Sequence, residues 1–163
     1  MDILLNNIKM NRKTYTGLIN NLSSNQIFVF GSNPEGRHGK GVAKIALTKY
    51  KAIYGQGHGL QGQSYGLITK NLTKGYHDPI TNITYNKYGF RSLSKEQITD
   101  NIKKLYELAD NMTDTEFYIA YTVGGKNLNG YTDKEMAKMF YDAKPIPENI
   151  IFEDNFLQYV MNN

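Results

Sequence analysis

The feature that most limits what this chain can fold into is the placement of its glycines. Twelve of the 15 glycines lie in three clusters, at 31–41, 55–66 and 124–130. The first and third clusters each follow a strand-like run, 26–30 and 117–123, and each precedes a stretch with helical periodicity. A buried strand that leads into a glycine-rich loop and then a helix is typical of α/β proteins. The chain is therefore expected to build an α/β domain around these two junctions.

The first junction carries the strongest functional signal. Residues 26–30 are β-branched and aromatic, and the stretch 42–50 places apolar residues where a helix packed on a sheet would need them. Glycines allow backbone N–H groups to approach a ligand closely, and a helix start adds unpaired donors and the positive end of its dipole. The loop 31–41 is therefore predicted to hold a phosphate-bearing ligand.

The remaining elements alternate along the chain. A strand is expected over 64–69, a hairpin within 80–88 and a last strand over 149–152. Helices are expected over 94–112 and from Thr132 to about Tyr141, and each begins with a capping box, Ser94 with Gln97 and Thr132 with Glu135. Before residue 26, the range 3–8 suggests a strand, and 15–22 suggests either a short helix or a turn-rich segment. This order favours a mostly parallel or mixed central sheet.

In an open α/β sheet, ligands bind beyond the carboxyl ends of the strands. Because the first and third glycine clusters both follow strands, they are expected at the same edge of the sheet. Two loops at one edge can hold one ligand from two sides. The role of the middle cluster, 55–66, stays open.

Composition limits the class of protein. With 163 residues, 40% hydrophobic and 21% charged, the chain is expected to form a single globular domain over 1–163. No apolar run approaches the roughly 20 residues of a membrane helix, and the first ten residues are too polar for a signal peptide. Because the chain has no cysteine, disulfides and thiol chemistry are excluded. A cytoplasmic location is expected.

Charge favours an anionic partner. The net charge is +4 and the calculated pI is about 9.1, although a modest lysine excess also serves solubility alone. No basic stripe interleaved with aromatic residues is present, so nucleic acid is an unlikely partner. A small phosphorylated or nucleotide-like ligand fits this charge better.

Two familiar nucleotide-binding patterns do not apply. Residues 57–62 match GxGxxG, but a strand-like segment follows where a dinucleotide-binding fold needs a helix. The loop 31–41 lacks the GK[ST] ending of a P-loop, since Val42 follows Gly41. His58 and His77 stand alone, and no HExxH pattern occurs. No metal and no cofactor are expected.

Two stretches resemble the signature of macrodomains. GSNPEGRHGKGVAKIAL (31–47) has the asparagine, glycine-rich loop and Val-Ala helix of that signature, and TVGGKNLNGYTDKEMAKMF (122–140) is similar to its second phosphate-binding loop. The span 26–153 is similar to short macrodomain-like proteins of bacteria and their phages. The resemblance implies a three-layer α/β/α fold with a mixed sheet that binds ADP-ribose or its derivatives.

The resemblance also implies roles for individual residues. Asn33 would face the distal ribose, and backbone N–H groups of the first loop would meet the adjoining phosphate. The second loop would surround the pyrophosphate. The residues implied in these two loops are Gly39, Gly41 and Val42, then Gly124, Gly125, Lys126, Asn127 and Gly130.

Other candidates follow from residue type, each with a plainer alternative. His38 is either a general acid/base or a hydrogen-bond donor to a ribose or phosphate, or it is a solvent-facing loop histidine. Arg37 and Lys40 either pair with phosphates or are plain surface charges. Tyr131 either stacks on a base or a ribose, or it belongs to the core. Asn33 itself is also a typical turn asparagine. Gly31, Ser32 and Thr122 complete the expected binding site.

The functional expectation is hydrolysis of a bond at the distal ribose of an ADP-ribosyl ester or of ADP-ribose 1″-phosphate. Asn33 would position the ribose, and His38 or an ordered water would assist proton transfer. The alternative is a non-catalytic binder or sensor of an NAD-derived nucleotide. An ADP-ribosylated protein is a further candidate partner. The aspartate that recognises adenine in macrodomains has no convincing counterpart here, and Arg37, His38 and Lys40 interrupt the usual glycine run. Base and leaving group therefore stay open.

Overall fold

The computed structural model describes residues 12–125 and 127–163. A six-stranded sheet forms the centre of the fold, and its strands lie in the order β1-β8-β7-β2-β4-β3. All neighbouring pairs are parallel except β3 with β4, which is antiparallel. The expected mixed sheet is thus confirmed. In chain order the strands are β1 (Thr14–Tyr15), β2 (Gln26–Ser32), β3 (Gly59–Gln61), β4 (Ser64–Ile68), β7 (Glu116–Ile119) and β8 (Ile150–Glu153).

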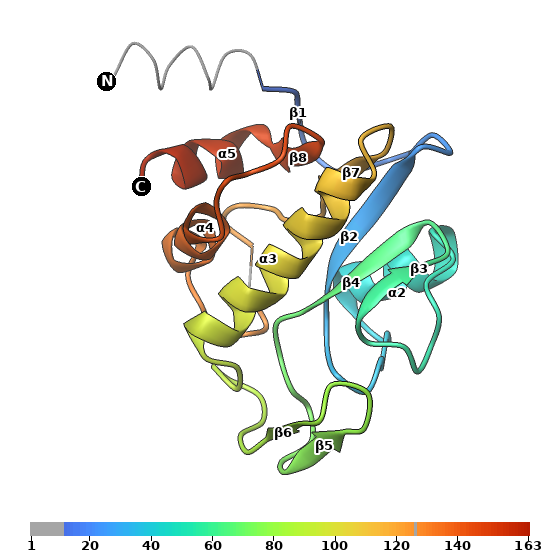
Figure 1. The fold of residues 1–163 in the computed structure, drawn as a ribbon, viewed down its shortest axis with the longest axis vertical. Coiled ribbons are helices and arrows are strands. Elements are labelled where there is room, and N and C mark those ends of the chain that lie inside the picture. The colour runs from blue at the N-terminus through green and yellow to red at the C-terminus, as the bar shows by residue number, and fades with distance from the viewer. Residues whose placement is uncertain (1–11, 126) are drawn as a thin grey trace.

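Helices cover both faces of the sheet. Alternate side chains of β2 point to opposite faces, as the pleat of a strand requires. Phe28 and Phe30 pack with buried residues of α2 (Gly41–Lys49), whereas Ile27 and Val29 belong to the larger core. That larger core includes α3 (Lys95–Asn111), α4 (Asp133–Asp142) and α5 (Asp154–Met161). Figure 1 shows α2 on one side of the sheet and the other three helices on the opposite side, consistent with three α/β/α layers.

The sequence patterns predicted the longer elements well. Both capping boxes are present. The side chains of Ser94 and Thr132 accept the backbone N–H groups of Gln97 and Glu135, whose side chains in turn accept the N–H groups of the two capping residues. The strand expected over 117–123 ends earlier, at Ile119. The reason is local, because the Tyr121 N–H turns back to the Ile119 carbonyl (2.9 Å) and leaves the ladder.

The irregular segments were harder to predict. The hairpin consists of β5 (Tyr76–Asp78) and β6 (Ile83–Tyr85), so it begins four residues before the expected range. The strands β1 and β3 and the helix α5 were not predicted. A strand over 3–8 lies outside the described residues. Over residues 12–125 and 127–163, no helix is long and apolar enough to cross a membrane.

Glu135 gives a pH-dependent contribution to stability. Its carboxylate accepts the Thr132 N–H (3.0 Å) and pairs with Arg91 (2.8 Å) and Lys95 (3.0 Å). The pKa of Glu135 is lowered from 4.5 to about 2. The main cause is the hydrogen bond from the Thr132 N–H, and Lys95 adds to it. Because this pKa is lower in the folded chain, the stabilisation is present above about pH 4.5 and is lost as pH falls toward 2.

We therefore expect Glu135→Gln to flatten the fall in unfolding free energy between about pH 5 and pH 2. Urea denaturation at a series of pH values measures this slope. The exposed Glu107, changed to Gln, serves as the control and should retain the wild-type slope. Equal slopes for the two variants would contradict the assignment.

Candidate functional site

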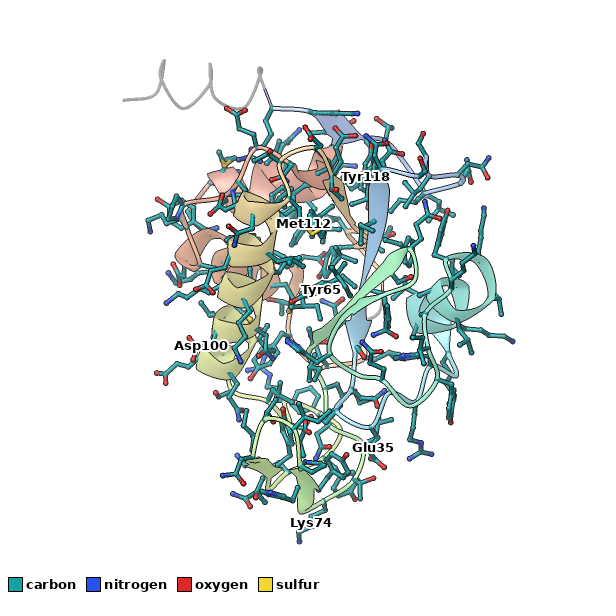
Figure 2. All side chains as sticks on the ribbon, turned by 45° about the vertical axis from the view of Figure 1, so that its right-hand side comes forward. Glu35, Tyr65, Lys74, Asp100, Met112 and Tyr118 are labelled. Carbon is teal, nitrogen blue, oxygen red and sulfur yellow. The ribbon has the colours of Figure 1, made fainter. Side chains whose placement is uncertain are left out.

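The carboxyl ends of β2, β4 and β7 border one cavity of about 720 Å³. This volume lies within the range of small-molecule sites. The cavity is lined by residues of the loop after β2, the segment after β4 and the loop after β7. Figure 2 shows Glu35, in the loop after β2, in the lower half of the molecule and above Lys74. The first and third glycine clusters thus meet at one edge of the sheet, as expected from their positions after parallel strands.

Most of the predicted site residues line this cavity. Four described ones do not, namely His38, Gly124, Gly130 and Tyr131. Lys126 lies outside the described residues. The predicted residues that do line it are Gly31, Ser32, Asn33, Arg37, Gly39, Lys40, Gly41, Val42, Thr122, Gly125 and Asn127.

Asn33 shapes the first loop with its own side chain. Its Nδ2 donates to the Arg37 carbonyl (3.1 Å), and its Oδ1 accepts the Arg37 N–H (3.0 Å). The side chain is buried, and its Oδ1 and one of its two Nδ2 hydrogens bond to the Arg37 backbone within the loop. Asn33 lines the cavity and at the same time performs the turn-forming role that the sequence left open.

His38 is directed away from the cavity. Its ring is fully buried, and its edge packs against Phe30. Nε2 lies 2.8 Å from the Gln56 carbonyl and 3.1 Å from Gln61 Oε1, so it carries the proton and donates. His38 is therefore neither a solvent-facing histidine nor a residue of the cavity wall. It holds the segment 56–61 against the first loop.

This contact explains the middle glycine cluster. No residue of 55–66 lines the cavity. Instead the Gly55 N–H donates to the Gly36 carbonyl (2.9 Å), and the backbone at Gly57 lies directly against the first loop. A Cβ at Gly57 would lie 2.1 Å from the Asn33 carbonyl oxygen. Glycine is needed here for close backbone packing, so the middle cluster supports the first loop from behind.

A hydrogen-bond network fixes the second loop. Asp133, the first residue of α4, accepts the Tyr121 hydroxyl (2.5 Å) and the Gly124 N–H (3.0 Å). Asn127 donates to the Tyr121 hydroxyl (2.5 Å) and to the Tyr131 carbonyl (2.7 Å). Burial, with the nearby Asp133 carboxylate, raises the pKa of Tyr121 well above its usual value. The Gly124 N–H is thus directed to Asp133, and Gly124 is not part of the cavity wall.

Tyr131 belongs to the core. Its ring is buried, its hydroxyl donates to the Leu93 carbonyl (2.7 Å), and the Arg91 guanidinium carbon lies 4.8 Å from its ring centre. Gly130 beside it packs against the Phe90 ring, where a Cβ would come within 2.5 Å. These two positions therefore stabilise the loop base and do not face the cavity.

Three of the described residues that line the cavity are cationic. Arg37 and Lys40 come from the first loop, and Lys70 follows β4. Helix α2 begins at Gly41 without a side-chain cap from Lys40 and without an acidic residue in its first turn. The first N–H groups of a helix have no intrahelical partner, so this helix start suits an anion. Among the described residues that line the cavity there is no Asp, Glu or His.

The part of the cavity wall on the α3–α5 side of the sheet is largely apolar, and it was not predicted from the sequence. It consists of buried side chains from three strands and from α4: Val29, Leu67, Ile119, Met136 and Phe140. Their sequence signal is the ordinary periodicity of core residues, which does not show that a cavity reaches them. Tyr54, at 62% exposure, also lines the cavity and was not predicted as a site residue.

Within residues 12–125 and 127–163, no group of three His, Asp or Glu side chains is arranged to hold a metal ion. Comparison with models of protein families, with curated proteins and with solved structures finds no match to this chain. The fold and the site define an α/β domain with a cavity at the carboxyl ends of its parallel strands, and both cationic and apolar side chains line this cavity.

Proposed function

We propose that this cavity binds ADP-ribose or a related NAD-derived nucleotide. One observation carries the proposal: two loops about 90 residues apart in sequence line a single cavity, and one of them leads into the uncapped start of α2. Both loops are the stretches whose residues resemble macrodomain loops. A diphosphate between them would accept from backbone N–H groups of the first loop.

The two sides of the cavity suit the two halves of a nucleotide. Arg37, Lys40 and Lys70 provide positive charge for phosphates, and the apolar side suits a flat ring. A cytoplasmic location belongs to this proposal, since NAD-derived nucleotides are intracellular metabolites.

The same geometry favours binding over turnover. The described lining offers no carboxylate or imidazole for general acid/base catalysis. His38, the other predicted catalytic residue, is directed toward Gln56 and Gln61 and does not reach the cavity. Hydrolysis at the distal ribose remains the second candidate, because Asn33 stands in the cavity wall directly after β2. It would require an ordered water as the attacking group.

Isothermal titration with ADP-ribose tests the proposal and is expected to give one site per chain. A parallel incubation with ADP-ribose 1″-phosphate and with ADP-ribosylated protein, followed by chromatography, tests turnover. Binding without product supports the binder, and release of phosphate or free ADP-ribose supports the hydrolase. If titration with ADP-ribose shows no heat of binding, while oligonucleotides bind with an affinity that falls steeply with salt, the proposal is wrong.

A further inference from the structure

Asn129 is a buried polar side chain on the apolar side of the cavity. It is 8% exposed and lines the cavity. Its Oδ1 accepts the Tyr131 N–H (3.0 Å), while its Nδ2 has the sulfur of Met136 as partner (3.3 Å). An amide nitrogen has two N–H donors, and a thioether sulfur is only a weak acceptor. Asn129 therefore retains donor capacity inside a largely apolar environment.

The buried residues that line the cavity on this side come from two neighbouring strands and from α4. Val29 and Ile119 are direct partners across β2 and β7, and Met136 and Phe140 lie one turn apart on α4. All of them belong to the core on the α3–α5 side of the sheet. Arg37 and Lys40 come instead from the loop that leads into α2, on the other side. The apolar part of the cavity is thus formed by core residues, and Asn129 is a buried polar group that lies beside Met136 in this part.

Only one portion of an ADP-ribose-like ligand suits the apolar part. A phosphate would lose its hydration without gaining a cation, and ribose hydroxyls would find too few partners among Val29, Ile119 and Phe140. A purine is flat, largely apolar on its faces and carries hydrogen-bond acceptors on its edge. The polarizable sulfur of Met136 is also a favourable neighbour for an aromatic ring.

We infer that the nucleobase occupies this apolar part and that the free N–H of Asn129 Nδ2 donates to a purine ring nitrogen. This inference rests on the proposed function, which leaves the base unassigned. The orientation of the amide is fixed, because a flip would take Oδ1 away from the Tyr131 N–H. Asn129 therefore presents a donor, and it selects bases with an unprotonated ring nitrogen, as adenine has at three positions.

The test compares two ligands on the same variant. Wild type and Asn129→Ala are titrated with ADP-ribose and with bis(ribosyl) diphosphate, which lacks the adenine. We expect Asn129→Ala to weaken ADP-ribose binding about tenfold, the size of one buried hydrogen bond, and to leave the base-free ligand within about twofold. An equal loss for both ligands would show that Asn129 only maintains the loop, and would overturn the inference.

A second measurement separates this inference from the proposed function. Adenosine alone is added to ¹⁵N-labelled wild type, and the side-chain amide signal of Asn129 is followed by NMR. A saturable shift together with ADP-ribose binding supports both proposals. A shift with adenosine but no binding of ADP-ribose supports the base site and rejects the proposed function. Binding of ADP-ribose without a shift at Asn129 rejects the base site alone, and no response to either ligand rejects both.

Discussion

Gly125→Glu is expected to lower the affinity for ADP-ribose by about 100-fold or more while the chain stays folded. Gly125 is exposed and lines the cavity in the second loop. A Cβ there would lie 3.5 Å from its nearest neighbour, the Thr122 carbonyl oxygen, so a side chain fits. The new carboxylate would stand beside the ligand phosphates and would compete with them for Arg37 and Lys40. A 100-fold loss corresponds to about 2.7 kcal/mol.

Two matched variants separate charge from size at this position. Gly125→Gln has nearly the volume of glutamate without its charge, and Gly125→Ala adds only a methyl group. We expect alanine to change the affinity by less than about threefold and glutamine to fall between alanine and glutamate. Calorimetry at low and at moderate salt should show the glutamate effect shrinking as charges are screened. Full affinity in Gly125→Glu would place the phosphates elsewhere and contradict the proposed site.

Gly57→Ala is expected to lower the free energy of unfolding by about 3 kcal/mol or more. The added methyl group would lie 2.1 Å from the Asn33 carbonyl oxygen and 2.9 Å from that of Pro34. Both neighbours are backbone, so the first loop or the middle segment has to move. For a chain of this size such a loss lowers the melting temperature by roughly 6–12 °C. Urea denaturation and thermal unfolding measure the two quantities.

Gly39→Ala is the control for this experiment. Gly39 lies in the first loop, against which the Gly57 backbone packs, but no other part of the chain lies within 4 Å of a Cβ built there. We expect its stability to remain within about 0.5 kcal/mol of wild type. Were Gly57→Ala as stable as Gly39→Ala, the close packing between the middle cluster and the first loop would be refuted.

The parts of this fold that follow local rules could be predicted from sequence. Capping boxes at Ser94 and Thr132 and the apolar run at 26–30 depend on neighbours within a few residues. The strand β1 could not be predicted in this way, because its two residues are defined by pairing with β8, almost 140 positions later. Helix α5 was missed because the apolar stretch before it was assigned to the last strand alone.

The candidate site, too, could be predicted from the sequence only in part. Glycines after parallel strands predicted which two loops meet, since this follows from the topology of such sheets. The direction of side chains did not follow from the sequence. His38 and Tyr131 are directed by distant partners, Gln56 and Gln61 for the first and Leu93 for the second. The apolar side of the cavity was missed because its residues have the same pattern as any core.

The division of the hydrophobic interior by the sheet has a further consequence. On the α2 side only a handful of side chains hold the helix to Phe28 and Phe30, whereas the other side packs three helices together. Opening of the thinner layer therefore costs less than opening of the thicker one, and amide protons of α2 should exchange with solvent sooner than those of α3. A ligand in the cavity that contacts both layers would couple their opening, so that the two layers would unfold together.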